Sequence, residues 1–388
     1  MRTAHQDRPR AHSRADRRDH DRPRVLLAPV TITPTKPLTL SHLKGLLWTD
    51  VMYRATGRLA DVTYRYSHTT YHVTEQTLGF WEHLDRTLGD TDYSGWSEER
   101  VGESYVRYRA EEHRPTATQL KPYADAVERH GWTHPASSRV LELWTTLYDR
   151  LGLHDPGLRE HQPPRLDLSA MIDCLDDLGM CVDLREHGGP VYLDATRHGL
   201  PLRQIVLPDG RPNYLACALR ELIPLAAEHD EVVLLHDREL EPDYLLLRQV
   251  LSALGPAVCR VSLGRVPVAG QVLSARHGGW QGNTVGALLD RLADVAGGED
   301  PAVLRLGLRL YFIAVLGQGQ EQSFREDLVV GCLGKARRLL DSAPARAEGS
   351  VAGHRGDHVH VDPYRLTSAL LARHRPRPGP EVVAGVFT

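Results

Sequence analysis

Residues 34–45 read PTKPLTLSHLKG, and they lie between a run typical of a buried strand and a run typical of an amphipathic helix. The strand is VLLAPVTI at 25–32, which is apolar almost throughout. The helix begins at Ser41, a residue suited to capping, and has apolar residues at helical spacing to about residue 59. The alternating run ADVTYRYSHTTY at 60–71 predicts a second strand. This order predicts one βαβ half of a nucleotide-binding sheet.

The rest of the chain extends this pattern. Residues 75–160 are polar and rich in aromatic and charged side chains, which favours a helical insertion. The run EVVLLHD at 231–237 predicts a buried parallel strand, YLLLRQVLSALG at 244–255 a helix, and VCRVSLGRVPV at 258–268 another strand. We therefore expect an α/β fold: a Rossmann-like, doubly wound parallel sheet with a helical insertion and a C-terminal helical extension. Its site should lie at the carboxyl ends of the strands.

The two ends of the sequence differ from the centre in composition. Residues 1–24 are mostly Arg, Asp, His and small residues, which predicts a disordered tail; an RNA-contacting basic arm is the alternative. We assign residues 25–300 to the main domain and 301–342 to a helical region. Residues 343–388 are expected to form a loose tail with one short helix around 363–373.

Composition excludes several classes of protein. The 47 Lys and Arg nearly balance the 50 Asp and Glu, so no global basic field favours nucleic acid. The five cysteines are too few for a disulfide framework and are expected as free thiols. We find no membrane-length apolar run and no signal-like segment, and we expect a cytoplasmic protein without a membrane partner. A His-rich tail, rather than a metal site, is the favoured interpretation of His354, Asp357, His358 and His360.

The segment at 34–45 resembles the first signature of the class I aminoacyl-tRNA synthetases, which in the arginine enzymes reads P-T-K/G-P-L-H-V-G-H-L-R. Further segments resemble the arginyl-tRNA synthetases in the family's own order: 147–152, 192–199, 209–215, 273–276 with 282–285, and 304–312. This colinear similarity spans roughly residues 25–340. The chain thus resembles the catalytic domain of an arginyl-tRNA synthetase, and we expect it to lack the domain that grips the tRNA elbow and a complete anticodon-binding domain.

The resemblance implies ATP as cofactor, with Mg²⁺ as its accompanying ion, bound where a helix N-terminus faces the phosphates. It also implies roles for individual residues. On the nucleotide we place Thr39, Ser41, His42, Glu239 and Arg276, with Glu239 accepting a ribose hydroxyl. The expected catalytic residues are His42, Ser274 and Arg276, and the expected substrate-binding residues are Thr33, His68, Tyr214 and Ala218.

The signatures depart from the family pattern where the nucleotide binds. Thr39 stands for the leading His, and Ser41 stands for the Gly on which adenine lies flat. Asp237 stands for another Gly near the nucleotide, where its carboxylate would repel phosphates. In the second signature loop, Val272 stands where a Lys is common, Ala275 stands where Lys or Thr is common, and Arg276 keeps one cation. We expect these changes to weaken ATP binding rather than to abolish it.

Arginine recognition is also rewritten. Tyr214 is retained, but the family's Asp one helical turn later is Ala218. Thr33 and Ala28 stand for the Asn and Glu before the first signature. Because a buried guanidinium without a carboxylate is costly, we predict that arginine is not the substrate. A smaller, less cationic or more apolar acid is expected.

Three functions are compatible with these residues. The first is adenylation of a carboxylic acid and its transfer to a small amine or carrier in specialised metabolism. The second is transfer from aminoacyl-tRNA without ATP, as in the similarly remodelled cyclodipeptide synthases, with Ser41 offered as nucleophile but no visible base. The third is a non-catalytic paralogue that binds a partner or tRNA, without reading an anticodon. Trp280, in a lengthened loop, is either a lid over the ligand or a core residue.

Overall fold

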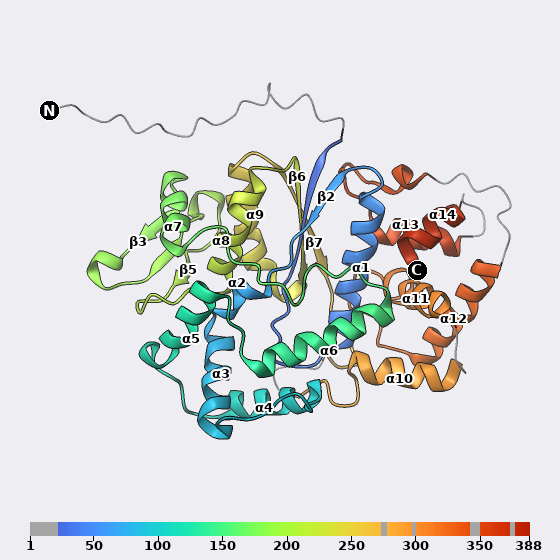
Figure 1. The fold of residues 1–388 in the computed structure, drawn as a ribbon. Coiled ribbons are helices and arrows are strands. Elements are labelled where there is room, and N and C mark those ends of the chain that lie inside the picture. The colour runs from blue at the N-terminus through green and yellow to red at the C-terminus, as the bar shows by residue number, and fades with distance from the viewer. Residues whose placement is uncertain (1–21, 273–277, 297–299, 342–349, 373–376) are drawn as a thin grey trace.

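A four-stranded parallel sheet forms the centre of the molecule, with strand order β2-β1-β6-β7 (Figure 1). The computed structural model describes residues 22–272, 278–296, 300–341, 350–372 and 377–388. The strands are β1 (Arg24–Pro29), β2 (Asp61–Tyr64), β6 (Glu231–Asp237) and β7 (Ala257–Leu263). The chain leaves β1 toward β2 on one side and reaches β6 and β7 on the other. The sheet therefore has its switch point between β1 and β6.

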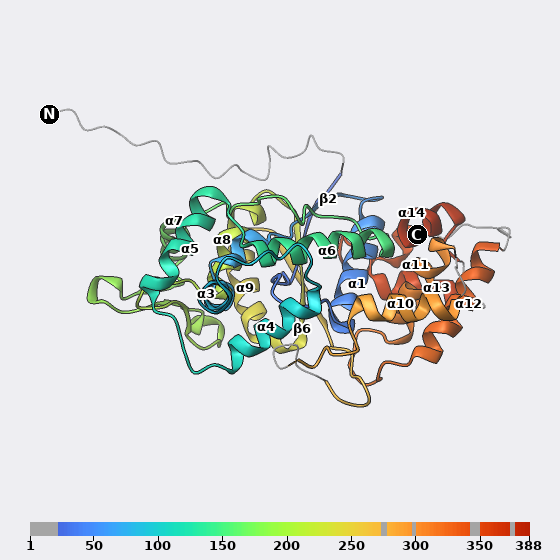
Figure 2. The ribbon, with the colours of Figure 1, turned by 60° about the horizontal axis from the view of Figure 1, so that its bottom comes forward.

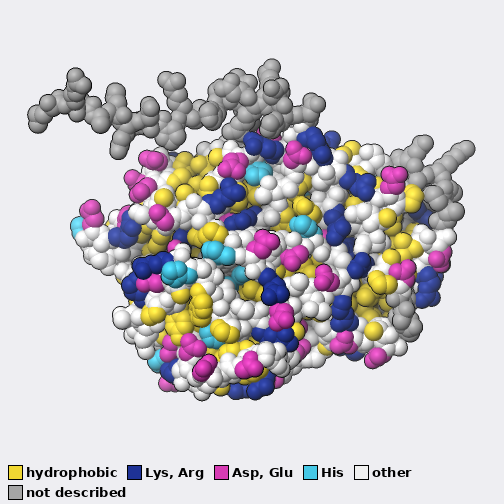
Figure 3. Space-filling model, in the orientation of Figure 1, with side chains coloured by type: hydrophobic (Ala, Val, Ile, Leu, Met, Phe, Trp, Pro, Cys, Tyr) yellow, Lys and Arg dark blue, Asp and Glu magenta, His cyan; other side chains and the backbone are white. Residues whose placement is uncertain are grey.

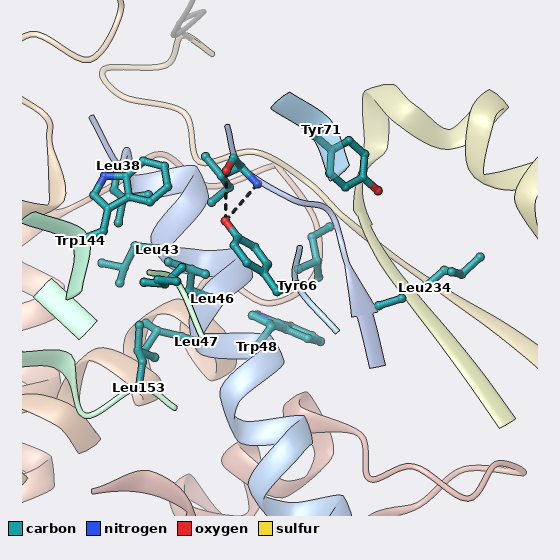
Figure 4. Packing of buried hydrophobic residues seen from close by; sticks show 14 of the residues in the cluster. Leu38, Leu43, Leu46, Leu47, Trp48, Tyr66, Tyr71, Trp144, Leu153 and Leu234 are labelled. Atoms are coloured by element: carbon teal, nitrogen blue, oxygen red, sulfur yellow. Dashed lines mark hydrogen bonds between the residues drawn. The ribbon is translucent and has the colours of Figure 1, made fainter. Parts of the chain in front are cut away.

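Helices cover both faces of this sheet, as expected for a doubly wound fold (Figure 1). Helix α1 (Leu40–Thr56) connects β1 to β2 and packs on one face, whereas α8 (Tyr214–Ala226) and α9 (Glu241–Ala253) pack on the other. Figure 4 shows the leucines of α1 and Trp48 packed around Tyr66, whose hydroxyl points at the backbone beyond β1. The predicted α/β class is confirmed.

The predicted helical insertion is present as four helices that lie below the sheet in Figure 1. They are α3 (Glu75–Leu88), α4 (Glu98–Ala110), α5 (Ala117–His130) and α6 (Pro135–Leu151). The strand predicted at 60–71 is wrong beyond Tyr64. The strand ends at that residue, and the short helix α2 (His68–His72) follows. The Ser67 hydroxyl caps this helix by accepting a hydrogen bond from the backbone N–H of Thr70.

A small antiparallel sheet, β3-β4-β5, lies at the end of the molecule opposite the C-terminal helices (Figures 1 and 2). Its strands are β3 (Cys181–Asp183), β4 (Val191–Leu193) and β5 (Arg203–Val206), and α7 (Leu168–Asp177) precedes them. The 3₁₀ turns η2 (Arg185–His187) and η3 (Thr196–His198) lie between successive strands of this sheet. A third 3₁₀ turn, η4 (Arg238–Leu240), follows β6.

The C-terminal region is helical and well packed. It contains α10 (Val285–Ala296), α11 (Pro301–Arg309), the π-helical η6 (Leu310–Val315), α12 (Glu326–Asp341), the 3₁₀ turn η7 (Val351–His354), α13 (Pro363–Leu371) and α14 (Pro380–Phe387). Of the tail predicted from 343 onward, the short helix expected around 363–373 is present as α13, but the other described residues are not loose as predicted. Val386 and Phe387 are fully buried, because α14 packs its apolar side chains against α1 and α11. Of the predicted disordered segment 1–24, only residues 22–24 are described.

Other properties bear on the classes of protein considered above. All five cysteines are free. Among the described residues, no helix has the length and apolar character needed to span a bilayer. Figure 3 shows side chains of both charge signs interspersed over the visible face, with no large basic patch.

Candidate functional site

A small cavity lies at the switch point, where β1 and β6 end beside the first turns of α1. Its wall includes Pro29 and Val30 at the end of β1, Ser41 and His42 in α1, and Asp237 at the end of β6. The cavity measures about 30 Å³, which holds one or two water molecules. Ligand cavities are generally roughly 300–1,000 Å³. A nucleotide therefore requires this site to open.

Thr39 and His42 form a reciprocal cap at the start of α1. The Thr39 backbone N–H donates to His42 Nδ1 at 3.1 Å, and the His42 N–H donates to the Thr39 hydroxyl at 3.4 Å. Burial, together with the nearby charges of Lys36 and Arg265, lowers the pKa of His42 to about 3. The ring is therefore neutral near pH 7. Because Nδ1 accepts a hydrogen bond, the proton is on Nε2, which is a donor.

Two cationic side chains, Lys36 and Arg265, lie near His42, and Arg265 is paired with carboxylates. Lys36 is buried, with Nζ 5.3 Å from the centre of the Tyr105 ring. Arg265 Nε lies 3.2 Å from a Glu239 oxygen and 3.8 Å from an Asp237 oxygen. Burial, and secondarily Glu239, raises the pKa of Asp237. Glu239, which we expected to hold a ribose hydroxyl, thus pairs with Arg265 in this structure.

Ser41 lines the cavity from the first turn of α1. Its hydroxyl accepts a hydrogen bond from the Val266 backbone N–H at 3.0 Å, which holds the segment after β7 against α1. The Ser41 side chain therefore tethers this segment to α1 as well as occupying space at the cavity. The same hydrogen bond engages the hydroxyl that a nucleophilic role for Ser41 would use.

Lys44, one turn further along α1, fixes the same segment from inside the protein. Its Nζ donates to the carbonyls of Gly264 at 2.9 Å, Gly319 at 2.7 Å and Gln318 at 3.3 Å. Burial lowers the pKa of Lys44 to about 8. A Cβ on Gly264 would lie 2.7 Å from the Gly319 carbonyl, so only glycine allows this approach. The end of β7 is thus locked to the turn after η6.

Aromatic rings pack around Tyr214, one of the residues predicted to bind the substrate. Tyr214 packs on Tyr71 with ring centres 4.6 Å apart, and burial raises the pKa of Tyr214 to about 12. Ala218, one turn later in α8, is 1% exposed. Thr33 accepts a hydrogen bond from Gln76 Nε2 at 3.0 Å. The nearby carboxylate of Glu221 is paired with Arg65 and Thr70, so it is not free to bind a guanidinium.

Glu98 is a site residue that the sequence reasoning missed. It is 6% exposed, and one carboxylate oxygen accepts from the Leu38 N–H at 3.3 Å and from Trp144 Nε1 at 3.1 Å. Burial, then the neighbouring Glu99, raises the pKa of Glu98 to about 7. The residue anchors the loop before α1 from α4, a helix that its local sequence does not connect to the first signature.

The remaining predicted residues fall into different places. His68 is 3% exposed and lines a separate, larger cavity instead of the switch-point cavity. Trp280 is 2% exposed and packs beside Gly102 and Pro37, so it is a core residue in this structure. Ser274 and Arg276 lie outside the described residues.

The C-terminal histidines contact the opposite end of the sheet. Glu231, at the start of β6, accepts from His360 Nδ1 at 2.6 Å and from the Val359 N–H at 2.9 Å. His358 stacks on His360, with ring centres 5.1 Å apart. Within the described ranges, no group of three or more potential ligands is arranged to hold a metal ion. His360 therefore helps to attach the C-terminal segment to the sheet.

Comparison with solved structures finds similar chains among the arginyl-tRNA synthetases. The enzyme from Thermus thermophilus matches with a TM-score of 0.64 at 14% identity, over 94% of this chain and 80% of that one. The Plasmodium falciparum enzyme matches with a TM-score of 0.52 at 11% identity, over 84% of this chain and 58% of that one. No protein-family model and no curated protein matches the sequence.

Proposed function

We propose that this chain, which has the fold of a class I aminoacyl-tRNA synthetase of the arginyl type, activates a small carboxylic acid with ATP. The acid would then pass to an amine or carrier, without recognition of a tRNA anticodon. In the first step, a carboxylate oxygen attacks the α-phosphorus of ATP and pyrophosphate leaves. In the second, the acceptor attacks the acyl carbon and AMP leaves.

The observation that carries this proposal is the state of His42. It is neutral, it presents an Nε2–H donor at the N-terminus of a 17-residue helix, and it lies near Lys36 and Arg265. A helix N-terminus, a fixed donor and cations together favour a phosphate group. Positioned donors of this kind stabilise the charge that develops during phosphoryl or adenylyl transfer.

The closed cavity implies that ATP binding is coupled to opening. Opening requires loss of the hydrogen bond between Ser41 and Val266, and movement of Arg265 away from its two carboxylates. One neutral hydrogen bond contributes about 1 kcal/mol, and an exposed ion pair about 1 kcal/mol or less. These costs weaken binding without preventing it, because the affinity is reduced only by the population of the open state.

The acid would have no charged side chain. Ala218 offers no partner to a cationic side chain, and Glu221 is engaged by Arg65. The rings of Tyr71 and Tyr214 leave an aromatic, weakly polar surface in place of a guanidinium pocket. An aliphatic or aromatic amino acid suits these surroundings better than arginine.

The test is acid-dependent exchange of labelled pyrophosphate into ATP, measured on the wild type, His42→Ala and Arg276→Ala. We expect both substitutions to abolish the exchange. His354→Ala, which changes a histidine of η7 outside the predicted site, is the control and should retain it. Exchange that is indifferent to both His42→Ala and Arg276→Ala would show that the reaction occurs elsewhere.

A second candidate, a non-catalytic binding paralogue, is favoured by one observation. The cavity at the proposed nucleotide site measures only about 30 Å³, and the Asp237 carboxylate lines it. This alternative predicts that millimolar ATP gives no thermal stabilisation of the protein. Our proposal predicts an increase in melting temperature under the same conditions.

A further inference from the structure

A second cavity, of about 560 Å³, lies behind the segment that follows β2. We call it the His68 cavity. Its walls come from α2, the loop at 91–94, the start of α6 and the segment 159–161. Its volume lies within the range of small-molecule sites, roughly 300–1,000 Å³. The proposed adenylation does not use it, and His68 is the one lining residue that was predicted to bind the substrate.

The His68 cavity is separate from the switch-point cavity, although one segment borders both. Tyr66 lines the switch-point cavity, and His68 lines the other. The intervening Ser67 has extended backbone geometry, with φ −102° and ψ 96°. Side chains two residues apart take different directions once the strand ends and α2 begins. On the far side of α2, Tyr71 contacts Tyr214, so this helix forms part of the wall between the two sites.

Two residues that line the His68 cavity each carry a buried polar atom without a protein partner. The atoms are Nδ1 of His68, a residue 3% exposed, and the hydroxyl of Tyr93, a residue 4% exposed. A buried polar group without a partner is costly, and native proteins rarely keep one without a reason. Burial lowers the pKa of His68 to about 4, so its ring is neutral near pH 7. Neither atom has accessible surface in this structure, so a hydrogen bond to a ligand requires the side chain to turn toward the cavity.

Charges of both signs surround these two groups. Arg139 is committed to Glu142, at 2.9 Å, and to the Trp96 carbonyl, at 3.1 Å. Arg159, Glu160 and Asp92 are exposed at the rim of the cavity. The Ser94 N–H and hydroxyl both donate to Asp92, which lowers the pKa of that carboxyl and keeps it ionised.

This charge pattern selects against simple anions. The lining has one more carboxylate than guanidinium, so a phosphate would meet net repulsion. A ligand with an ammonium and a carboxylate group satisfies both signs at once: Asp92 and Glu160 attract the ammonium, and Arg159 attracts the carboxylate.

The rim is tightly packed at one point, which favours a formed site over a loose surface hollow. Gly131 has a φ of +63°, and a Cβ there would lie 2.4 Å from the His161 ring. Any side chain at this position would therefore displace His161, which lines the cavity.

We propose that the His68 cavity binds a free α-amino acid or a short peptide, held at its ammonium and carboxylate groups by the rim charges and at its interior by Tyr93 and His68. This site does not depend on the proposed adenylation, and its binding is measured without ATP.

The test is isothermal titration of the whole chain with glycine and triglycine, and with methylamine, acetate and inorganic phosphate as partial or anionic probes. We expect glycine or triglycine to bind more tightly than any of the other three. The relative affinity of glycine and triglycine distinguishes a free amino acid from a peptide. Phosphate binding more tightly than both, or no saturable binding of either at millimolar concentration, would overturn the proposal.

Two variants locate the binding. Tyr93→Phe removes a hydroxyl that has no protein partner, so it should leave the melting temperature unchanged or higher while weakening the ligand about fivefold. Arg159→Gln should weaken the carboxylate-bearing probes about tenfold and leave methylamine unaffected. The matched controls are Tyr148→Phe, whose buried hydroxyl is also unpartnered but lies elsewhere, and Arg107→Gln on the surface. Equal effects from variants and controls would refute this location.

Discussion

Replacing Ser41 tests whether this residue keeps the proposed nucleotide site closed. In Ser41→Gly the hydrogen bond to Val266 N, 3.0 Å long in the structure, is lost. That bond contributes about 1 kcal/mol, and glycine in the first helical turn costs about a further half kcal/mol. We therefore expect the free energy of unfolding to fall by about 1–2 kcal/mol, as measured by urea denaturation.

Binding of ATP should change in the opposite direction. If the tether must break before ATP enters, removing it returns about 1 kcal/mol to binding, which tightens the dissociation constant about fivefold. Isothermal titration with ATP measures this gain. Ser41→Ala is the matched control, because it removes the hydroxyl and keeps the Cβ. A gain in both variants identifies the tether; a gain in glycine alone identifies crowding by the Cβ.

The reasoning fails if both variants lose stability as expected and neither binds ATP more tightly. That result would show that the segment after β7 is not the barrier. The locked contact between Lys44 and the carbonyls of Gly264 and Gly319 would then be the next barrier to examine.

Three further predictions concern stability. The pKa of Glu98 is raised from 4.5 to about 7, so this carboxyl favours the folded state below pH 4.5 and the advantage is lost as the pH rises to 7. Glu98→Gln keeps an acceptor for Leu38 N but does not titrate, so its free energy of unfolding should exceed that of the wild type by about 3 kcal/mol above pH 7. Urea denaturation would refute this if the free energies of unfolding of the two proteins changed equally with pH. Lys44→Met should lower the melting temperature through a loss of about 1–3 kcal/mol, because three carbonyls lose their donor; an unchanged transition would argue against the clamp. His360→Ala should weaken attachment of the C-terminal segment to Glu231 and speed its cleavage in limited proteolysis, with His354→Ala as control; equal cleavage rates would contradict that role.

Local sequence pattern was sufficient for the central fold. The apolar runs at 25–32 and 231–237 and the helical spacing from Ser41 each carry strong signals within a dozen residues, and the structure confirms the βαβ unit that they predict. The cap was predicted at Ser41, whereas the N-cap in the structure is Thr39. The strand predicted through residue 71 failed because alternation continued past Tyr64, while the cap at Ser67 started a helix. Of the helices after residue 343, α13 falls within the short helix predicted around 363–373, whereas α14 was missed because it is short and takes its stability from packing on α1 and α11.

The candidate site was predictable only in part. The signature resemblance located His42 and Ser41 at the switch point, where the structure places them. It could not reveal that Ser41 holds Val266, or that Arg265 engages Glu239, because these contacts join segments far apart in the sequence. His68 was assigned to the substrate pocket from its position after β2, but the direction of its side chain depends on where that strand ends.

The central claim is that the α1 site activates a small acid other than arginine. Pyrophosphate exchange into ATP, measured across a panel of amino acids and simple carboxylic acids, tests it most directly. We predict that at least one aliphatic or aromatic acid supports exchange and that arginine does not. Exchange driven by arginine would contradict the rewritten specificity. No exchange with any acid, together with no thermal stabilisation by ATP, would contradict the adenylation chemistry itself.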